Sequence, residues 1–260
     1  MRYEILGPIR VVDNGIVSSL SARKVEVLLG ALLIRANQVV PASQLMTEIW
    51  GDNPPRRASA GLHVYVSQLR KFLSREHCPQ SPIVTTPPGY LLRLDGDELD
   101  VDVFQQRMSE GRTFQRAGRW EEACAAFESA LALWHGAPVG DLRDGPVING
   151  FVGWAEQARL ECVEELVDAA LMLGRHREYV SYLYVLTTEY PLREAFYRQL
   201  MLALARSGCQ ADALKVYQSA RNILRTELGL EPCRNLRELQ RAILLDDPRL
   251  ELAGAATPSR

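Results

Sequence analysis

The sequence predicts a multidomain protein: an α+β module over residues 1–94, an all-α, repeat-built module over residues 98–247, and a disordered tail over residues 248–260. Turn signals rich in Gly, Pro and Asn separate short apolar segments in the first module, whereas apolar residues recur at helical spacing in the second. The net charge also changes sign, because residues 1–94 hold 11 basic and 6 acidic residues and residues 95–260 hold 19 and 26. A basic module joined to an acidic one is typical of a nucleic-acid reader with a protein-binding partner domain.

The first module begins with short strand candidates at residues 3–7 and 9–12, and the strand pattern continues at residues 16–20. Asn14 and Gly15 separate the last two segments, and both residue types tolerate the positive φ that a tight hairpin turn requires. We therefore expect a small antiparallel sheet of three or four strands at the N-terminus.

Three helices are predicted after this sheet. The first begins at the N-cap Ser21 and ends before Asn37, and a short second helix begins after Pro41. The third runs from about residue 56 to residue 75. Its apolar stripe consists of Ala58, Leu62, Tyr65, Val66, Leu69 and Leu73, and the opposite face holds Arg56, Ala60, His63, Val64, Ser67, Arg70 and Lys71.

A β-hairpin completes the first module, since residues 83–86 and 90–94 flank the turn sequence Pro87-Pro88-Gly89. Sheet, three helices and hairpin is the element order of a winged helix with an extra N-terminal sheet. The acidic residues 95–98 then indicate the domain junction.

The second module contains three similar helix-turn-helix joints, each with a central glycine. Gly174 and Gly208 are 34 residues apart, which is the period of a tetratricopeptide repeat. Gly118 and Gly174 are 56 residues apart, and the Gly- and Pro-containing stretch 135–153 accounts for most of the excess of 22. We interpret that stretch as an insertion within one repeat.

The five cysteines lack the short spacings of a zinc site or a redox dithiol, so we expect unpaired thiols in a reducing compartment. No apolar run is long enough to span a bilayer, and the first residues do not form a signal peptide. We expect a cytoplasmic, nucleoid-associated protein with no membrane partner, metal or cofactor.

Enzymatic function is disfavoured, because the sequence has no phosphate-binding glycine loop, nucleophile elbow or metal-binding histidine pair. The four histidines are scattered, and we expect them to face solvent. A receiver domain of a response regulator has no counterpart in the sequence. The alternative to a DNA reader is a tetratricopeptide-like interaction scaffold that does not read DNA.

Three motifs carry a resemblance to a known family. They are Leu-His-Val-Tyr-Val-Ser-Gln-Leu-Arg-Lys at 62–71, Thr-Thr-Pro-Pro-Gly-Tyr-Leu-Leu at 85–92, and Glu-Leu-Gly-Leu-Glu-Pro at 227–232. Together they resemble the Streptomyces antibiotic regulatory protein family over about residues 1–247. The resemblance implies an OmpR-type winged helix-turn-helix domain followed by a tetratricopeptide-like bacterial transcriptional activator domain.

The resemblance makes the third helix the recognition helix in the major groove. Arg70 and Lys71 are then expected at phosphates, as are Arg56 and Arg57 at the helix N-terminus, although Arg57 also fits a plain surface charge. In the recognition helix this chain has Ser67 and Gln68 where many relatives have Arg, and in the wing it has Thr86 where OmpR-type relatives often have Arg. A single copy is therefore expected to bind DNA weakly and to rely on a second protomer or on polymerase contacts. The complete set of predicted DNA-binding residues is Arg56, Arg57, His63, Val64, Ser67, Gln68, Arg70, Lys71, Thr85, Thr86, Gly89 and Tyr90. Within it, Gly89 is expected to supply the turn and Tyr90 to anchor the hairpin.

The function implied is a sequence-specific transcriptional activator that binds direct repeats in promoter DNA as a dimer. It would recruit RNA polymerase holoenzyme through the sigma factor and control a pathway of secondary metabolite, or antibiotic, biosynthesis. The loop of Gly51, Asp52, Asn53, Pro54 and Pro55 matches the family's transactivation loop and is expected to contact the polymerase, with a rigid linker as the alternative.

Overall fold

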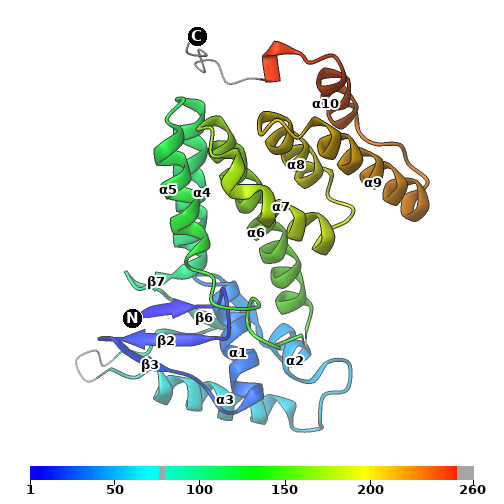
Figure 1. The fold of residues 1–260 in the computed structure, drawn as a ribbon. Coiled ribbons are helices and arrows are strands. Elements are labelled where there is room, and N and C mark those ends of the chain that lie inside the picture. Colours follow the sequence, from blue (N-terminus) through cyan, green and yellow to red (C-terminus); the bar gives the residue numbers. More distant parts are fainter. Residues whose placement is uncertain (76–79, 144, 251–260) are drawn as a thin grey trace. The chain divides into compact units, whose positions relative to one another are not determined.

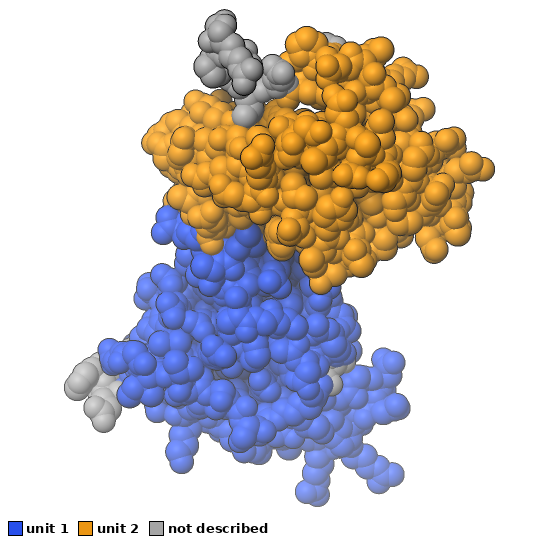
Figure 2. Space-filling model, viewed as in Figure 1, with its two compact units in different colours: residues 1–109, 129–161 blue, residues 110–128, 162–260 orange. Residues whose placement is uncertain are grey.

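The structure is a computed structural model that describes residues 1–75, 80–143 and 145–250. Its elements follow the predicted order (Figure 1). Two compact units divide the chain, as Figure 2 shows: residues 1–109 with 129–161, and residues 110–128 with those from 162 onward. The first unit thus takes in two segments that follow the predicted α+β module in the sequence.

A four-stranded sheet begins the first unit. Strands β1 (Arg2–Glu4), β2 (Arg10–Asp13), β3 (Ile16–Ser18) and β7 (Glu98–Leu99) lie in the order β3-β2-β1-β7. The predicted hairpin turn is confirmed, since Asn14 and Gly15 have φ of 49° and 81°. The fourth strand pairs parallel to β1 and lies partly in the segment that the sequence marked as a junction.

The three predicted helices are α1 (Arg23–Ile34), α2 (Ala42–Trp50) and α3 (Ala58–Phe72). The predicted N-cap of α1 is wrong: Ala22 occupies that position, and its carbonyl oxygen accepts from the N–H of Val25 at 2.9 Å. Helix α1 is buried along most of its length, from Val25 to Leu33, because the other two helices pack against it.

The wing is a three-stranded sheet in the order β4-β6-β5, with strands β4 (Val39–Pro41), β5 (Ile83–Thr86) and β6 (Gly89–Leu92). The predicted hairpin of β5 and β6 is confirmed. Strand β4 was not predicted, because its residues stand between two helices in the sequence and pair with β6 only in the folded chain.

The predicted repeat insertion at 135–153 belongs to the first unit. The N–H of Val139 donates to the carbonyl oxygen of Ile5 at 2.9 Å, and that of His135 donates to Leu6 at 3.1 Å. Val139 and Leu142 are buried. The expectation that His135 faces solvent is wrong, because its ring is mostly buried and its Nε2 lies 3.2 Å from the carbonyl oxygen of Pro8.

Asp100, the first residue of α4 (Asp100–Arg116), joins that helix to the chain after β1. Its Oδ2 accepts hydrogen bonds from the N–H groups of Ile5 and Leu6, at 2.8 and 2.9 Å. The residue is only 2 % exposed. Burial raises the pKa of the Asp100 carboxyl to about 6, although the two N–H donors oppose that rise.

The raised pKa of Asp100 predicts a pH-dependent stability. A carboxyl with a higher pKa in the folded state stabilises that state most at low pH, and this contribution is lost as pH rises through about 6. We expect the difference in unfolding free energy between wild type and Asp100→Asn to fall by about 2 kcal/mol from pH 4 to pH 7. Urea denaturation across this range measures the difference, and parallel curves for the two proteins would contradict the expectation.

The remaining helices are α5 (Trp120–Leu131), α6 (Pro146–Met172), α7 (His176–Glu189), α8 (Glu194–Arg206), α9 (Gln210–Leu228) and α10 (Arg234–Leu244). The three predicted joints are confirmed, since Gly118, Gly174 and Gly208 lie between helices with φ of 71°, 76° and 80°. Glycine adopts this left-handed conformation at the end of a helix more readily than any other residue, because it has no Cβ.

The first residues of the predicted disordered tail are folded, contrary to the expectation. Residues Pro248–Leu250 form a short 3-10 helix, and the carbonyl oxygen of Leu250 accepts from Arg206 Nε at 2.8 Å. Residues 251–260 of that tail lie outside the described residues.

Cys124 and Cys162 are buried free thiols, and Cys209 and Cys233 are exposed free thiols. Burial raises the pKa of the Cys162 thiol to about 12. Cys78 lies outside the described residues. Across the described chain, no cluster of three His, Cys, Asp or Glu side chains forms a metal-type site. Within the same residues, no helix is both long and apolar enough to cross a membrane.

Candidate nucleic-acid interface

Helix α3 presents one exposed polar face. Ala58, Leu62, Val66 and Leu69 are buried on its other side. Because these residues recur every three or four positions, the intervening side chains share the opposite face. The exposed residues on α3 that the sequence predicted for DNA are His63, Val64, Ser67, Gln68 and Lys71.

Val64 gives this face an apolar patch, since its side chain is 54 % exposed. Ser67 Oγ donates to the carbonyl oxygen of His63 at 3.0 Å, so its oxygen is held close to the helix. Gln68 and Lys71 extend into solvent. The face therefore offers a methyl surface, an amide and one cation, which are the groups that contact thymine methyls, base edges and phosphates.

Arg56 and Arg57 lie just before the helix rather than in its first turn. Helix α3 begins at Ala58, with Arg57 as its N-cap residue. Both arginines are exposed. The positive end of the helix dipole and two guanidinium groups therefore occur together, which favours an anion at this end.

Arg70 connects α3 to the wing. Its Nε donates to the carbonyl oxygen of Ile83 at 3.1 Å, and its Nη2 donates to Thr85 Oγ1 at 2.8 Å. Two sides of the guanidinium are thus engaged within the protein. Arg70, which was predicted to bind phosphate, therefore also has a structural role: it holds the Thr85 hydroxyl and the strand β5 against α3. Thr86, at the end of β5, is partly exposed.

Tyr90 lies under the polar face. Its hydroxyl group is 2.8 Å from Nδ1 of His63, and the two rings meet edge to face at 6.3 Å. Tyr90 itself is buried. This hydrogen bond fixes the orientation of the His63 imidazole and leaves its Nε2 for a ligand.

Gly89 is buried in β6, where it pairs with Pro41 of β4. A Cβ at this position would lie 1.9 Å from the carbonyl oxygen of Val40, so only glycine fits. Its φ is not positive, so the expectation that Gly89 supplies the turn is wrong. Because Gly89 and Tyr90 are both buried, they are removed from the set of residues expected to touch DNA directly.

The loop between α2 and α3 is an exposed feature of the same unit. Asp52, Asn53, Pro54 and Pro55 are exposed, and Gly51 has a φ of 63° with open space where a Cβ would stand. Ala58 N–H donates back to the carbonyl oxygen of Pro55 at 2.9 Å, which ties the end of the loop to α3.

Lys24 is a candidate residue that the sequence did not indicate. It is exposed near the start of α1, and its Nζ lies 5.4 Å from the centre of the Trp50 ring. Trp50 stacks on Tyr65 of α3 at 5.8 Å. These contacts bring a cation from α1 beside the end of α2 and the recognition-type helix. No spacing rule joins Lys24 to α3, because the residues are far apart in the sequence.

Glu48 fixes α2 against the start of α6. Its carboxylate is fully buried, with Oε1 accepting from the N–H of Val147 at 2.7 Å and Oε2 from Ile148 at 3.4 Å. Pro146 occupies the first position of α6 and has no N–H, so the carboxylate meets the next two free donors of the helix.

Two family models match the chain in sequence order. "Transcriptional regulatory protein, C terminal" matches residues 18–92, and "Bacterial transcriptional activator domain" matches residues 99–244. Regulatory protein DnrI of Streptomyces peucetius is 34 % identical, and the match covers 100 % of this chain and 97 % of DnrI. The transcriptional regulator RedD of Streptomyces coelicolor is 33 % identical over 98 % of this chain and 73 % of RedD.

Longer relatives match as well. The chain is 36 % identical to regulatory protein AfsR of Streptomyces griseus over 96 % of its own length but spans only 25 % of AfsR. A solved structure of Mycobacterium tuberculosis EmbR, in complex with a low affinity phosphopeptide, superposes with a TM-score of 0.90 at 31 % identity. It covers 95 % of this chain and 65 % of that one.

These matches confirm the predicted fold class, a winged helix-turn-helix followed by a helical activator region. The named relatives are transcriptional regulators rather than enzymes. The chain belongs to the Streptomyces antibiotic regulatory protein family of DNA-binding transcriptional activators.

Proposed function

We propose that this chain binds direct repeats in promoter DNA as a dimer and recruits RNA polymerase through its sigma factor, as a pathway-specific activator of secondary metabolite biosynthesis. The observation that carries the proposal is the exposed polar face of α3 in a chain of this family. A protein with this role works at the nucleoid, in the cytoplasm.

Each group on the face has a proposed task. Lys71, Arg56 and Arg57 contact phosphates, and Lys24 adds a further cation. The Nε2 of His63, the methyl groups of Val64 and the polar ends of Ser67 and Gln68 contact base edges. Arg70 and Thr85 hold the wing against α3, and Thr86 faces the sugar-phosphate backbone.

Two features support a need for partners. The family resemblance leads us to expect Arg at the position of Thr86 in the wing, and Arg70 is engaged within the protein, so each copy has fewer free cations for DNA. A second copy on an adjacent repeat adds its contacts to the first. In the second unit, exposed apolar side chains gather on α7 and the turn after it, which favours a protein-binding role: Tyr182, Tyr184, Val185, Tyr190 and Leu192.

The exposed residues 52–55 are proposed to contact the polymerase. In that case, replacing Asp52 and Asn53 with alanine lowers transcription in a reconstituted assay and leaves DNA affinity unchanged. If the loop is only a rigid linker, the double substitution is expected to change neither DNA affinity nor transcription.

Phosphate and base contacts are distinguished by salt titration of binding to a promoter fragment. We expect Lys71→Ala to weaken binding about five-fold on all sequences and to reduce the slope of log K against log salt by about 1. Gln68→Ala is expected to lower the preference for the operator over a single-base variant about ten-fold. Fluorescence anisotropy measures both quantities.

Arg35, the exposed C-cap residue of α1, provides the matched control. Arg35→Ala removes one positive charge outside the proposed contact set. If it lowers the salt slope as much as Lys71→Ala does, then the binding surface is not α3.

Footprinting of the full-length chain on promoters near its gene tests the dimer, which requires protection of two spaced repeats. No DNA affinity even at low salt would favour the interaction scaffold.

A further inference from the structure

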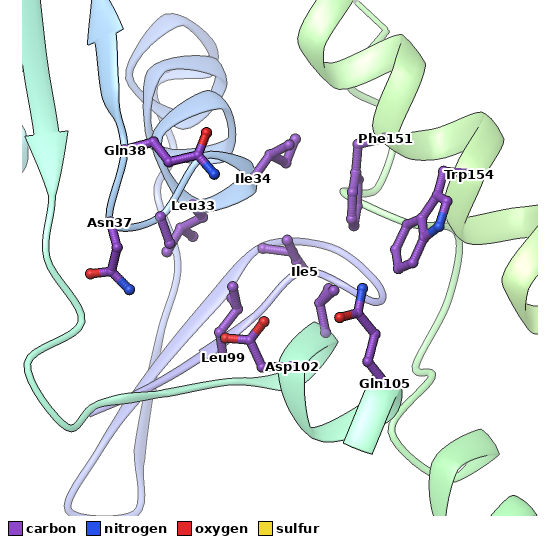
Figure 3. A pocket seen from close by; sticks show the side chains of 12 residues that line it. Ile5, Leu33, Ile34, Asn37, Gln38, Leu99, Asp102, Gln105, Phe151 and Trp154 are labelled. Carbon is purple, nitrogen blue, oxygen red and sulfur yellow. The ribbon is translucent and has the colours of Figure 1, made fainter. Parts of the chain in front are cut away.

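The first unit contains a pocket of about 330 Å³ that the DNA-binding proposal does not use. Its lining side chains come from the residue after β1, the end of α1, the segment after α1, the end of β7, the start of α4 and the first half of α6 (Figure 3). The floor is apolar and consists of Ile5, Leu33, Ile34, Leu99, Val101 and Phe151. A volume of this size accommodates a small organic molecule.

One carboxylate gives the pocket its charge. Asp102 lies at the rim, where partial burial of its carboxyl raises the pKa. Among the described residues, it makes no hydrogen bond or ion pair. The amide groups of Gln38 and Gln105 stand at the same rim (Figure 3). No Lys, Arg or His lines the pocket within the described chain, so its chemistry suits a cation and disfavours an anion.

Two aromatic rings form another part of the pocket lining. Phe151 and Trp154 come from adjacent turns of α6, with ring centres 5.7 Å apart and planes at 37°. Figure 3 shows both rings beside Ile5 and Gln105. Trp154 is 40 % exposed, although it adjoins buried apolar groups. An exposed indole and a carboxylate that line one pocket suit an organic cation, because the ring face attracts positive charge and the carboxylate accepts from N–H groups.

We propose that this pocket binds a small molecule with an apolar or aromatic body and a protonated amine. The ammonium group donates to the Asp102 carboxylate, and the body packs on Ile5, Phe151 and Trp154. The amide groups of Gln38 and Gln105 give additional hydrogen bonds at the rim. The site is independent of the DNA-binding face, so it stands whether or not that face reads DNA.

Three probes of similar shape test the charge preference on the full-length chain: 2-phenylethylamine, 2-phenylethanol and 3-phenylpropanoate. By isothermal titration calorimetry, the amine is expected to bind with a Kd of about 1 mM or lower. The alcohol is expected to bind at least about ten-fold more weakly, because it lacks the charge-assisted hydrogen bond. The acid is expected not to bind, because its carboxylate is repelled by the negative charge of Asp102.

Two variants assign binding to the pocket. Asp102→Asn is expected to weaken amine binding at least about ten-fold, because it removes the charge and keeps the shape. Trp154→Ala is expected to weaken binding of both the amine and the alcohol. Asp13→Asn, a carboxylate in the β2–β3 hairpin that does not line the pocket, is expected to leave binding unchanged.

The proposal is overturned if the amine and the alcohol bind equally, or if no saturable amine binding occurs. It is also overturned if Asp102→Asn binds the amine as tightly as wild type does. Unfolding curves of both pocket variants are recorded in parallel. Asp102 is exposed and unpaired but lies in the first turn of α4, where the helix dipole favours a negative charge, so its replacement is expected to lower the stability by no more than about 1 kcal/mol.

Discussion

Replacing Glu48 with alanine is expected to lower the free energy of unfolding by about 3 kcal/mol. The carboxylate is fully buried and accepts from the N–H groups of Val147 and Ile148 at the start of α6. Alanine leaves these donors without their acceptor and opens a space in the core. Urea denaturation at pH 7 measures the loss.

Glu48→Gln separates the hydrogen bond from the charge. Glutamine keeps one acceptor oxygen, so we expect it to recover part of the loss but not all, since the helix dipole also favours a negative charge. Glu128→Ala, at an exposed position on α5, is the control and is expected to change stability by less than about 0.5 kcal/mol. An equal effect of Glu48→Ala and Glu128→Ala would show that the carboxylate does not cap α6.

Replacing Gly89 with alanine is expected to destabilise the chain by more than about 3 kcal/mol. The new Cβ would lie 1.9 Å from the carbonyl oxygen of Val40 and 2.8 Å from the Cα of Pro41. Both atoms belong to the paired strand β4, which cannot move aside as a flexible side chain does. We expect a lower midpoint of thermal unfolding together with a loss of DNA affinity, because the wing and α3 share this support.

Gly150→Ala is the matched control for this substitution. Gly150 is exposed in the first part of α6, and a Cβ there meets nothing within 4 Å. Alanine is therefore expected to raise stability by up to about 1 kcal/mol, because it favours the helix. A Gly89→Ala protein as stable as wild type would contradict the close approach of β6 to β4.

Local patterns predicted much of the fold and part of the site. The Asn14-Gly15 turn, the three glycine joints and the polar face of α3 all follow from residues within a few positions of one another. A helix repeats every 3.6 residues, so the burial of Leu62, Val66 and Leu69 determines which side chains remain outside. The motif in this helix, together with those at 85–92 and 227–232, indicated the family.

By itself, the sequence determined which segments are helices, which face of α3 is polar and to which family the chain belongs. Only the tertiary structure decided that Tyr90 orients His63, that Arg70 holds Thr85, and that the stretch 135–153 packs in the first unit. The same holds for Glu48, whose partners are about a hundred residues away. The physical reason is that helix and turn propensities depend on near neighbours, whereas these contacts form only when distant segments are buried together.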